Sequence, residues 1–438
     1  MRFFCLFLHI SLYLCTMKLH IFNPEHDLAL AANLKQFTAP HAGRQLRSDL
    51  AFIPALWAEE GDLVLVDDID FAKNRVRHFG AELNSKVEFI TKPQLKHLLK
   101  TEFLDSVHPW GWNLSLKGEL ERLGMPEIML PTDAVLNKVR EVSSRQWAAL
   151  HLQRGVEYVT ETARVKELIL QHGKAVVKAP WSSSGRGVKY VSSEDFKTAG
   201  DYPTFERWVA NMIYHQGGVT VEPLYNKVRD FAMEFEMKDG KVLYRGLSLF
   251  DTIKNAYSGN VLCSEDDKVE MMKPLISEAQ LAGIRQRIIE VMEPALKDIY
   301  CGPFGVDMMI CTKGEKDEFC EAVLNQEGED VNRTGLGVVP CIEINLRRTM
   351  GHVAIDLYEH LVANSSDEMK TNRTNIMRVE YDGNRYHLRI KPGRPSEEAP
   401  LLAAEYKSAE SAKSQTESAQ NQAESRMGNA EPRKGYAE

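Results

Sequence analysis

The sequence predicts an α/β protein that contains more than one domain. Short apolar strands alternate with amphipathic helices over residues 17–129, a pattern typical of a sheet layered with helices. Around residues 176–191, two apolar runs flank a loop rich in serine and glycine, which indicates strand, loop and strand. The chain has 438 residues, too many for one ordinary core, so we expect two or three domains.

Composition is that of a globular protein without a nucleic-acid surface. Hydrophobic residues make up 43% of the chain and charged residues 26%. The net charge is −8 and no extended basic patch occurs, so neither nucleic acid nor a membrane is an expected partner. Seven cysteines form no CxxC pair and no zinc spacing, and several lie in apolar runs. We therefore expect free thiols and a cytoplasmic protein.

The two ends of the chain are set apart from the rest. Residues 3–15 are almost wholly apolar, but they lack a small-residue cleavage site and are too short to span a membrane. We favour a start at Met17 and interpret 1–16 as a mis-assigned start, with a weak signal-like segment as the alternative. Residues 395–438 are rich in Ala, Glu, Ser, Gln and Lys, which predicts a disordered tail.

The first domain is expected over residues 17–130. Its predicted strands and helices alternate along the chain, as in a parallel sheet covered by helices. The strands are expected at 19–22, 63–66 and 87–90, and the helices at 43–59 and 93–100.

Two further segments, 131–215 and 216–364, are expected to form separate parts of the protein. In the first, Thr132 is a predicted N-cap for a helix that carries Lys138. In the second, a helix is predicted over 277–299, where Leu281, Ile284, Ile288 and Val291 follow a helical period. Residues 365–394 then contain a predicted hairpin whose strands, 376–381 and 386–390, flank a type I′ turn at Asp382-Gly383.

The strand that ends at Lys178 indicates a phosphate site. The strand lysine is a fixed cation, and the following loop, Ser182-Ser183-Ser184-Gly185-Arg186-Gly187, is rich in backbone N–H groups that glycine lets approach an anion. In a Walker A loop the lysine follows the glycines, and in protein kinases the glycine loop comes first. Here the lysine precedes the loop, so neither pattern fits.

A second group of polar residues lies near the end of the folded region. In the predicted strand 341–348, side chains alternate between faces, so that Glu343, Asn345 and Arg347 share one face. Asp307 lies inside another apolar strand, where a carboxylate is costly unless it is paired or binds a metal. Two acids and an amide oxygen on adjacent strands suit Mg²⁺ that bridges phosphates.

In combination, these motifs resemble the ATP-grasp superfamily. Its members carry a strand lysine, a glycine-rich flap, an acidic hinge, an Asp strand and a Glu-x-Asn strand often continued by Arg. The matching positions, within about 131–361, are Lys178, residues 182–187, Glu222, Asp307 and Glu343-x-Asn345-x-Arg347. The resemblance, which is greatest to a bacterial branch, implies a pre-ATP-grasp domain (17–130) followed by two lobes, 131–215 and 216–364.

The resemblance also implies a role for each matching residue. ATP would be bound by Lys138, Lys178, Ser182, Ser183, Ser184, Gly185, Arg186, Gly187 and Glu222. One or two Mg²⁺ ions, or Mn²⁺ in their place, would be held by Asp307, Glu343 and Asn345. Arg347 would stabilise charge on the transferred phosphoryl group, and Arg245 would bind an anionic substrate group or a phosphate.

Several of these positions have a structural alternative. Lys138 could be a solvated helix lysine, Arg186 could point outward, and Arg245 could pair with Glu234 or Glu236. Asp230 and Glu234 compete with Glu222 for the ribose hydroxyls. The metal residues could instead form ion pairs with Arg347 or Arg348.

The chemistry that follows is ATP-dependent ligation. A substrate carboxylate would attack the γ-phosphate, and an amine would then attack the resulting acyl phosphate, with release of ADP and phosphate. The substrates would be small molecules, such as amino acids or peptides. A phosphotransferase and a nucleotide-binding regulator without turnover are the alternatives; the full metal set argues against the regulator.

Two segments of the first domain remain open between function and structure. Residues 22–27 follow the first strand, where α/β folds place ligands, and Arg44 and Arg47 lie on the next predicted helix. For Glu25-His26-Asp27, a binding role and turn formation are equally good interpretations. Residues 108–113, with Trp110 and Trp112, are interpreted more readily as a packing corner.

Overall fold

A computed structural model of the chain describes residues 17–77, 79, 86–182, 187–197, 202–253, 256–312, 321–322, 335–359, 377–381 and 386–390. By internal contacts the chain divides into two units, Met1–Arg389 and Ile390–Glu438. The described elements lie in the first unit, apart from Ile390 at the end of its last strand. The expected upstream segment 1–16 and tail 395–438 lie outside the described residues.

The first part of the chain has the expected α/β architecture, built on a parallel sheet with strand order β3-β2-β1-β4. Its strands are β1 Lys18–Ile21, β2 Leu63–Leu65, β3 Glu88–Ile90 and β4 Ser106–Pro109. Its helices are α1 His26–Ala32, α2 His41–Leu50, η1 Ile53–Leu56, α3 Ile69–Val76, α5 Lys92–Leu98, α6 Leu114–Leu123 and η2 Glu127–Met129. The buried core includes Leu19, Leu63 and Leu95, which are all fully enclosed.

One predicted helix of this domain is wrong in its extent. The helix expected over 43–59 is two elements, because α2 ends at Leu50 and a short 3₁₀ turn follows at Ile53–Leu56. Pro54 lies in this turn; it lacks a backbone N–H and disfavours helical geometry at the residue before it.

The second part has an antiparallel sheet with strand order β5-β8-β6-β7. Its elements are β5 Glu157–Val159, β6 Lys174–Lys178, β7 Val188–Ser192, β8 Val219–Pro223, α7 Asp133–Val142, α8 Arg145–His151, α9 Thr162–His172, η3 Ser193–Lys197 and α10 Tyr202–Gln216. Strand β8 follows residue 216 and still belongs to this sheet. As predicted, Thr132 caps α7, since its side chain accepts a hydrogen bond from the Val135 backbone.

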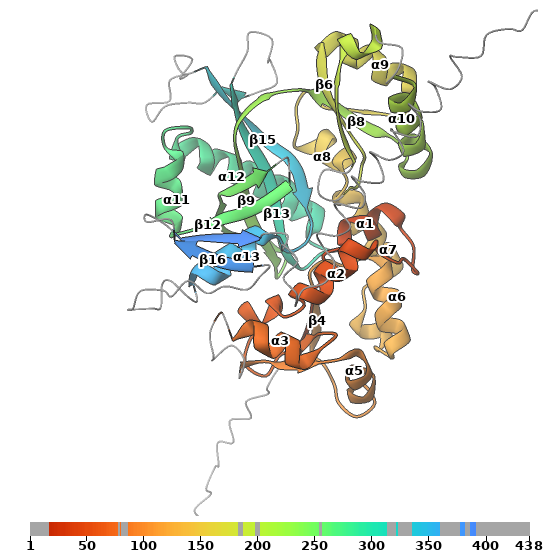
Figure 1. Cartoon of the computed structure of the whole chain (residues 1–438), viewed down its shortest axis with the longest axis vertical. Helices are drawn as coiled ribbons and strands as arrows, with labels where there is room; N and C mark the ends of the chain where they lie inside the picture. The colour runs from red at the N-terminus through yellow and green to blue at the C-terminus, as the bar shows by residue number, and fades with distance from the viewer. Residues whose placement is uncertain are drawn as a thin grey trace, which may run out of the picture. The chain divides into compact units, whose positions relative to one another are not determined.

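The third part contains a larger sheet with strand order β10-β9-β13-β15-β14. Its strands are β9 Asn226–Lys238, β10 Lys241–Ser248, β13 Gly302–Thr312, β14 Glu321–Ala322 and β15 Leu336–Asn345. Figure 1 shows α12 (Glu278–Leu296) beside this sheet, and α11 (Glu265–Met272) and α13 (Met350–Leu357) also contact it. Ser277 caps α12, and its apolar face buries Leu281, Ile284 and Ile288 as predicted, then Met292 rather than Val291.

A smaller sheet with order β11-β12-β17-β16 completes this part. Its strands are β11 Phe250–Ile253, β12 Ala256–Leu262, β16 Met377–Tyr381 and β17 Tyr386–Ile390. The two strands of the predicted hairpin are neighbours in it, while the turn at 382–383 lies outside the described residues. Within the described ranges, no helix is long and apolar enough to cross a membrane.

Candidate nucleotide and metal site

Lys178 and Glu222 lie together on the sheet of the second part. Lys178 ends β6 and lies directly opposite Thr220 of β8, so Glu222, two residues further on, projects from the same face. The two side chains form an ion pair, and each is only 8% exposed. Burial of both partners together avoids an unpaired charge, which would be strongly destabilising.

A hydrogen bond joins the segment before the flap (residues 182–187) to the last residue of the flap. The Ala179 backbone N–H donates to the Gly187 carbonyl at 2.8 Å. A Cβ at Gly187 would lie closer to the Ser182 Cβ than real atoms approach, so glycine is required where the loop returns. Ser183, Ser184, Gly185 and Arg186 lie outside the described residues.

Asp307 and Glu343 face each other on neighbouring strands of the larger sheet. They are directly opposed in the antiparallel pairing of β13 and β15, and Asn345 lies opposite Gly305 two residues along. The register shifts between Asp307 and Met309, and such bulges are common beside functional sites. Burial, and then the nearby Glu343 carboxylate, raise the pKa of Asp307 to about 7.

Arg145, which the sequence did not single out, joins these two groups of residues. It is the first residue of α8, and its side chain is only 5% exposed. Its Nη1 donates to the Ala179 carbonyl at 2.7 Å and to the Ser182 hydroxyl at 2.8 Å, while its Nη2 donates to Glu343 Oε1 at 2.7 Å. One guanidinium therefore contacts both the start of the flap and the Glu-x-Asn strand.

Lys138, the expected first-lobe cation, is exposed on α7. Its side chain is 63% exposed and its Nζ forms an ion pair with Glu141 at 3.0 Å on the same helix. This position agrees with the solvated alternative, and a role of Lys138 on the phosphates stays a prediction. Arg145 is a buried cation of the same part of the chain and contacts the carboxylate of Glu343.

Arg347 is held by a residue of the first domain. Its Nε and Nη2 donate to the two carboxylate oxygens of Asp27, in α1, at 3.0 and 2.8 Å, and Nη2 also donates to Asn345 Oδ1 at 3.0 Å. Burial alone would raise the pKa of Asp27, but the Arg347 guanidinium outweighs it and holds the pKa below its usual value. Such a bidentate pair fixes the guanidinium plane.

The remaining predicted residues have partners of their own. Arg245 lies 3.8 Å from Glu236, the alternative that the sequence left open. Of the competitors for Glu222, Asp230 pairs with Lys227 at 2.6 Å, and Glu234 lies buried 3.0 Å from His352 Nδ1.

Arg348 and the tryptophan segment serve packing. Arg348 pairs with Asp356 at 2.7 Å and lies over the ring of Trp57, with 4.2 Å between guanidinium carbon and ring centroid. Trp110 is buried, and its ring packs edge-on against Phe22 with 4.9 Å between centroids. The packing interpretation of residues 108–113 therefore accounts for Trp110.

The donor set suits a cation that is shared with a ligand. Among the described residues, no group of three or more His, Cys, Asp or Glu side chains could hold a metal ion alone. Asp307 and Glu343 offer two carboxylates, with Asn345 beside them. Mg²⁺ is commonly bound by one or two carboxylates together with substrate phosphates, so these residues fit a Mg²⁺ ion that a polyphosphate helps to hold.

Little space separates the elements at this point. A cavity of only about 10 Å³, close to the size of one water molecule, is lined by Asp27, Ser182, Glu343 and their neighbours.

In this mixed α/β fold, the buried Arg145 contacts the residue after the strand lysine Lys178 and, on the larger sheet, the carboxylate of Glu343. Solved structures that are similar in fold include several ATP-grasp enzymes. They include N5-carboxyaminoimidazole synthetase from Staphylococcus aureus complexed with ADP, which has 11% identity and a TM-score of 0.38, over 81% of this chain and 79% of that chain.

Two other similar structures are of the same kind. Biotin carboxylase from Campylobacter jejuni has 13% identity and a TM-score of 0.43, over 78% of this chain and 67% of that one. D-alanyl-alanine synthetase A from Vibrio cholerae has 14% identity and a TM-score of 0.41, over 79% and 93%. At such values the likeness concerns the fold alone. No protein-family model and no curated protein matches the sequence.

Proposed function

We propose that the protein is an ATP- and Mg²⁺-dependent ligase that joins a carboxylate to an amine in the cytoplasm. The observation that supports this most is the position of Arg145, which contacts Ser182 at the flap and Glu343 on β15. Two segments far apart in the sequence thereby lie within reach of one polyphosphate. A nucleotide site needs such a convergence of cations and acids.

The cations of the site would bind the phosphates. Lys178 lies at the end of its strand beside the flap, and Arg145 offers a planar guanidinium already aimed at the same region. Lys178 pairs with Glu222, and Arg145 pairs with Glu343. Nucleotide binding would exchange these carboxylate partners for phosphate oxygens; Glu343 would then hold the Mg²⁺ ion and Glu222 the ribose hydroxyls, so that no buried charge is left without a partner.

The acids would hold the cation that accompanies ATP. Asp307 and Glu343 are directly opposed, and Asn345 adds an amide oxygen. When bound, Mg²⁺ would offset the negative charge of the phosphates. Arg347, fixed by Asp27, would hold its guanidinium beside the Glu-x-Asn strand, where an anionic substrate group or the transferred phosphoryl group needs stabilisation.

The proposed reaction has two steps. A carboxylate oxygen of the acid substrate attacks the γ-phosphorus of ATP, the bond to the β-phosphate oxygen breaks, and ADP leaves. The amine nitrogen then attacks the carbonyl carbon of the acyl phosphate, the carbon–oxygen bond to phosphate breaks, and the amine loses a proton. The products are an amide, ADP and inorganic phosphate.

The test is a screen of amino acids and short peptides, singly and in pairs, with MgATP and the full chain. Release of ADP together with inorganic phosphate, only when both an acid and an amine are present, would support a ligase. Transfer of the γ-phosphate to one stable acceptor without free phosphate would show a phosphotransferase instead.

A further inference from the structure

The parallel sheet of the first domain carries a second cavity, of about 210 Å³, at the carboxyl ends of its strands. Segments that follow each of the four strands contribute to its wall, and α2 and α6 close its sides. The lining residues that bear charge are Glu25, Arg44, Arg47, Asp67, Lys92 and Glu119. This edge of an open α/β sheet is where such folds bind ligands.

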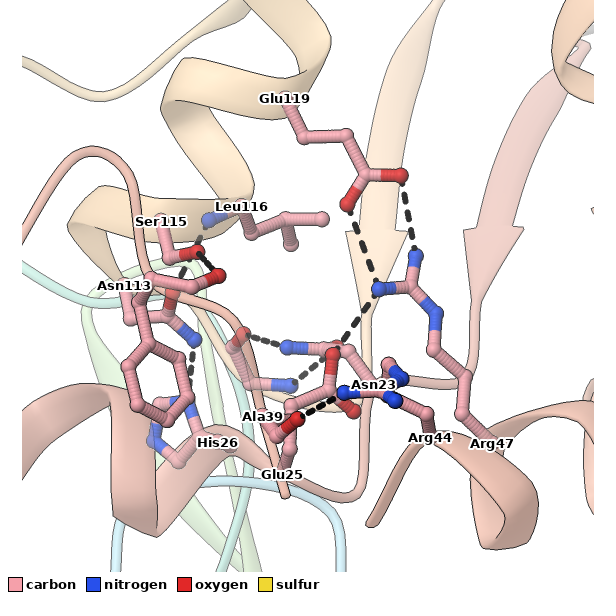
Figure 2. A network of polar contacts seen from close by, with 12 residues as sticks. Asn23, Glu25, His26, Ala39, Arg44, Arg47, Asn113, Ser115, Leu116 and Glu119 are labelled. Atoms are coloured by element: carbon pink, nitrogen blue, oxygen red, sulfur yellow. Dashed lines mark hydrogen bonds and ion pairs between the residues drawn. The ribbon is translucent and has the colours of Figure 1, made fainter. Parts of the chain in front are cut away.

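Four of these charged residues neutralise one another. Arg47 Nη1 lies 2.9 Å from Glu25 Oε1 and 3.2 Å from Glu119 Oε2, and Lys92 Nζ lies 2.7 Å from Glu119 Oε1. Figure 2 shows Arg47 reaching both acids from α2. The four side chains carry two positive and two negative charges, so the network needs no ligand to balance it.

Two polar groups at the cavity take no part in these ion pairs. Glu25 Oε2 is buried and has no hydrogen-bond donor, although Glu25 Oε1 is paired. Arg44 donates through Nη1 to the Ala39 carbonyl at 2.6 Å, and it forms no ion pair within the part of the chain that the structure describes. A buried acceptor left unpaired costs about 1–3 kcal/mol, which a ligand that donates to it would recover.

The two residues that carry these groups lie close together in the wall of the cavity. A Cβ built on Gly43 would lie 3.7 Å from the Glu25 Cβ, so the α2 backbone just before Arg44 runs against Glu25. In Figure 2, Arg44 and Arg47 project from this helix toward the segment that bears Glu25. A single small molecule can therefore contact both.

We propose that this cavity binds a free α-amino acid as one of the two substrates. The ammonium group would donate to Glu25 Oε2, and the carboxylate would accept from the Arg44 guanidinium. A ligand with only negative charge would meet the carboxylates of Glu25, Glu119 and Asp67. A purely cationic ligand would meet the two arginines and Lys92. A zwitterion satisfies both signs.

The size and place of the cavity agree with this class of ligand. A cavity of about 150 Å³ holds benzene, so the larger volume here accommodates a molecule of amino-acid size. Helix α1 links the cavity to the proposed ligation site, because Glu25 precedes it and Asp27 within it binds Arg347. The role as a substrate rests on the proposed ligase function, whereas the binding itself does not.

The experiment is calorimetric titration of the full chain with the proteinogenic L-amino acids, without nucleotide. The expected result is saturable binding of at least one of them. Its N-acetyl form and its amide, each lacking one charge, should bind at least about tenfold more weakly. Glu25→Gln and Arg44→Met should each weaken binding of the free amino acid by a similar factor.

The matched controls are Glu60→Gln and Arg77→Met, two exposed charges outside the cavity, which should bind like the parent. Absence of saturable binding for every amino acid, or equal binding by the Glu25 and Arg44 variants, would overturn the proposal. ADP titration of the same samples separates it from the ligase proposal. Absence of amino-acid binding with ADP binding retained would contradict only the proposal for this cavity. Absence of ADP binding with amino-acid binding retained would contradict only the proposed nucleotide site.

Discussion

The two charged sites of this protein are organised in opposite ways. At the proposed nucleotide site, Lys178 and Arg145 each have a carboxylate partner, so the proposal requires a nucleotide to replace these contacts. In the first part of the chain, Arg47 and its partners form a closed network, beside which Glu25 Oε2 has no hydrogen-bond donor and Arg44 has no carboxylate partner among the described residues. If both proposals hold, binding at the nucleotide site requires ion pairs to be exchanged, whereas binding at the cavity loses less free energy to rearrangement.

The largest effect is expected from Glu343→Gln, which removes a proposed metal ligand together with the partner of Arg145. ADP should then bind equally well with and without Mg²⁺, whereas in the parent Mg²⁺ should strengthen binding by at least about a hundredfold. The measurement is titration with ADP in the presence of Mg²⁺ or of a chelator. Glu236→Gln, on the same face of the sheet, is the control, and an unchanged Mg²⁺ effect in Glu343→Gln would refute the assignment.

The second-largest effect is expected when Lys178 and its partner Glu222 are both replaced, which tests whether Lys178 binds phosphate. Lys178→Met alone leaves Glu222 buried and unpaired, which costs about 3–5 kcal/mol of stability, so the double variant with Glu222→Gln is the one to measure. It should fold with a melting temperature near that of the parent and bind ATP about tenfold to a hundredfold more weakly. ATP affinity equal to that of the parent would remove Lys178 from the phosphate site.

The sequence predicted the elements that carry these residues better than it predicted their contacts. Apolar runs located β6, β7 and β13, and the alternation of apolar and polar residues located β15. The sequence placed Asp307 and Glu343 on adjacent strands, but it did not give the register that makes them directly opposed. The split at Pro54 was missed because the apolar spacing of residues 43–59 continues across it.

Arg145 shows why the rest could not be predicted. Its neighbours in the sequence, Ser144 and Gln146, suggest only the start of a helix. Its partner Glu343 lies 198 residues away, and no local pattern marks a contact of that length. The sequence could not decide between the two interpretations of Lys138, because helix position alone does not show which side of α7 is exposed. The pairing of Asp27 with Arg347 was hidden for the same reason.

A smaller effect concerns pH. The pKa of Asp307 is raised from 3.8 to about 7, so this carboxyl is mostly protonated below pH 7 in the folded protein. Protons then compete with Mg²⁺, and the Mg²⁺ enhancement of ADP binding should fall about tenfold per pH unit below 7 and level off above it. Asp307→Asn should abolish that dependence, and the same slope in this variant would assign the proton elsewhere.

The raised pKa of Asp307 also determines how the stability of the folded protein changes with pH. Because the folded pKa lies above the unfolded one, the folded state binds more protons between pH 4 and 7. The stabilisation linked to Asp307 is complete at low pH and is lost as pH rises toward 7. Asp307→Asn should therefore gain stability relative to the parent over this range, as urea unfolding at pH 5 and pH 8 would show.

The smallest effect distinguishes the two candidate cations of the first lobe. Lys138→Gln should change ATP affinity by less than about twofold, because an exposed pair such as Lys138 with Glu141 contributes little. Arg145→Gln should weaken ATP binding by about tenfold or more. The same titration measures both, and the opposite ranking would restore Lys138 as the phosphate ligand.

The turn after β1 makes the spacing of its residues more important than their individual identities. Glu25 reaches Arg47, His26 is enclosed beside Asn113, and Asp27 reaches Arg347, so three consecutive side chains point in three directions. An insertion of one residue before His26 would rotate every later position of α1 by about 100°. Homologous proteins should therefore vary the chemistry of this turn more readily than its length, contrary to the usual tolerance of surface connections.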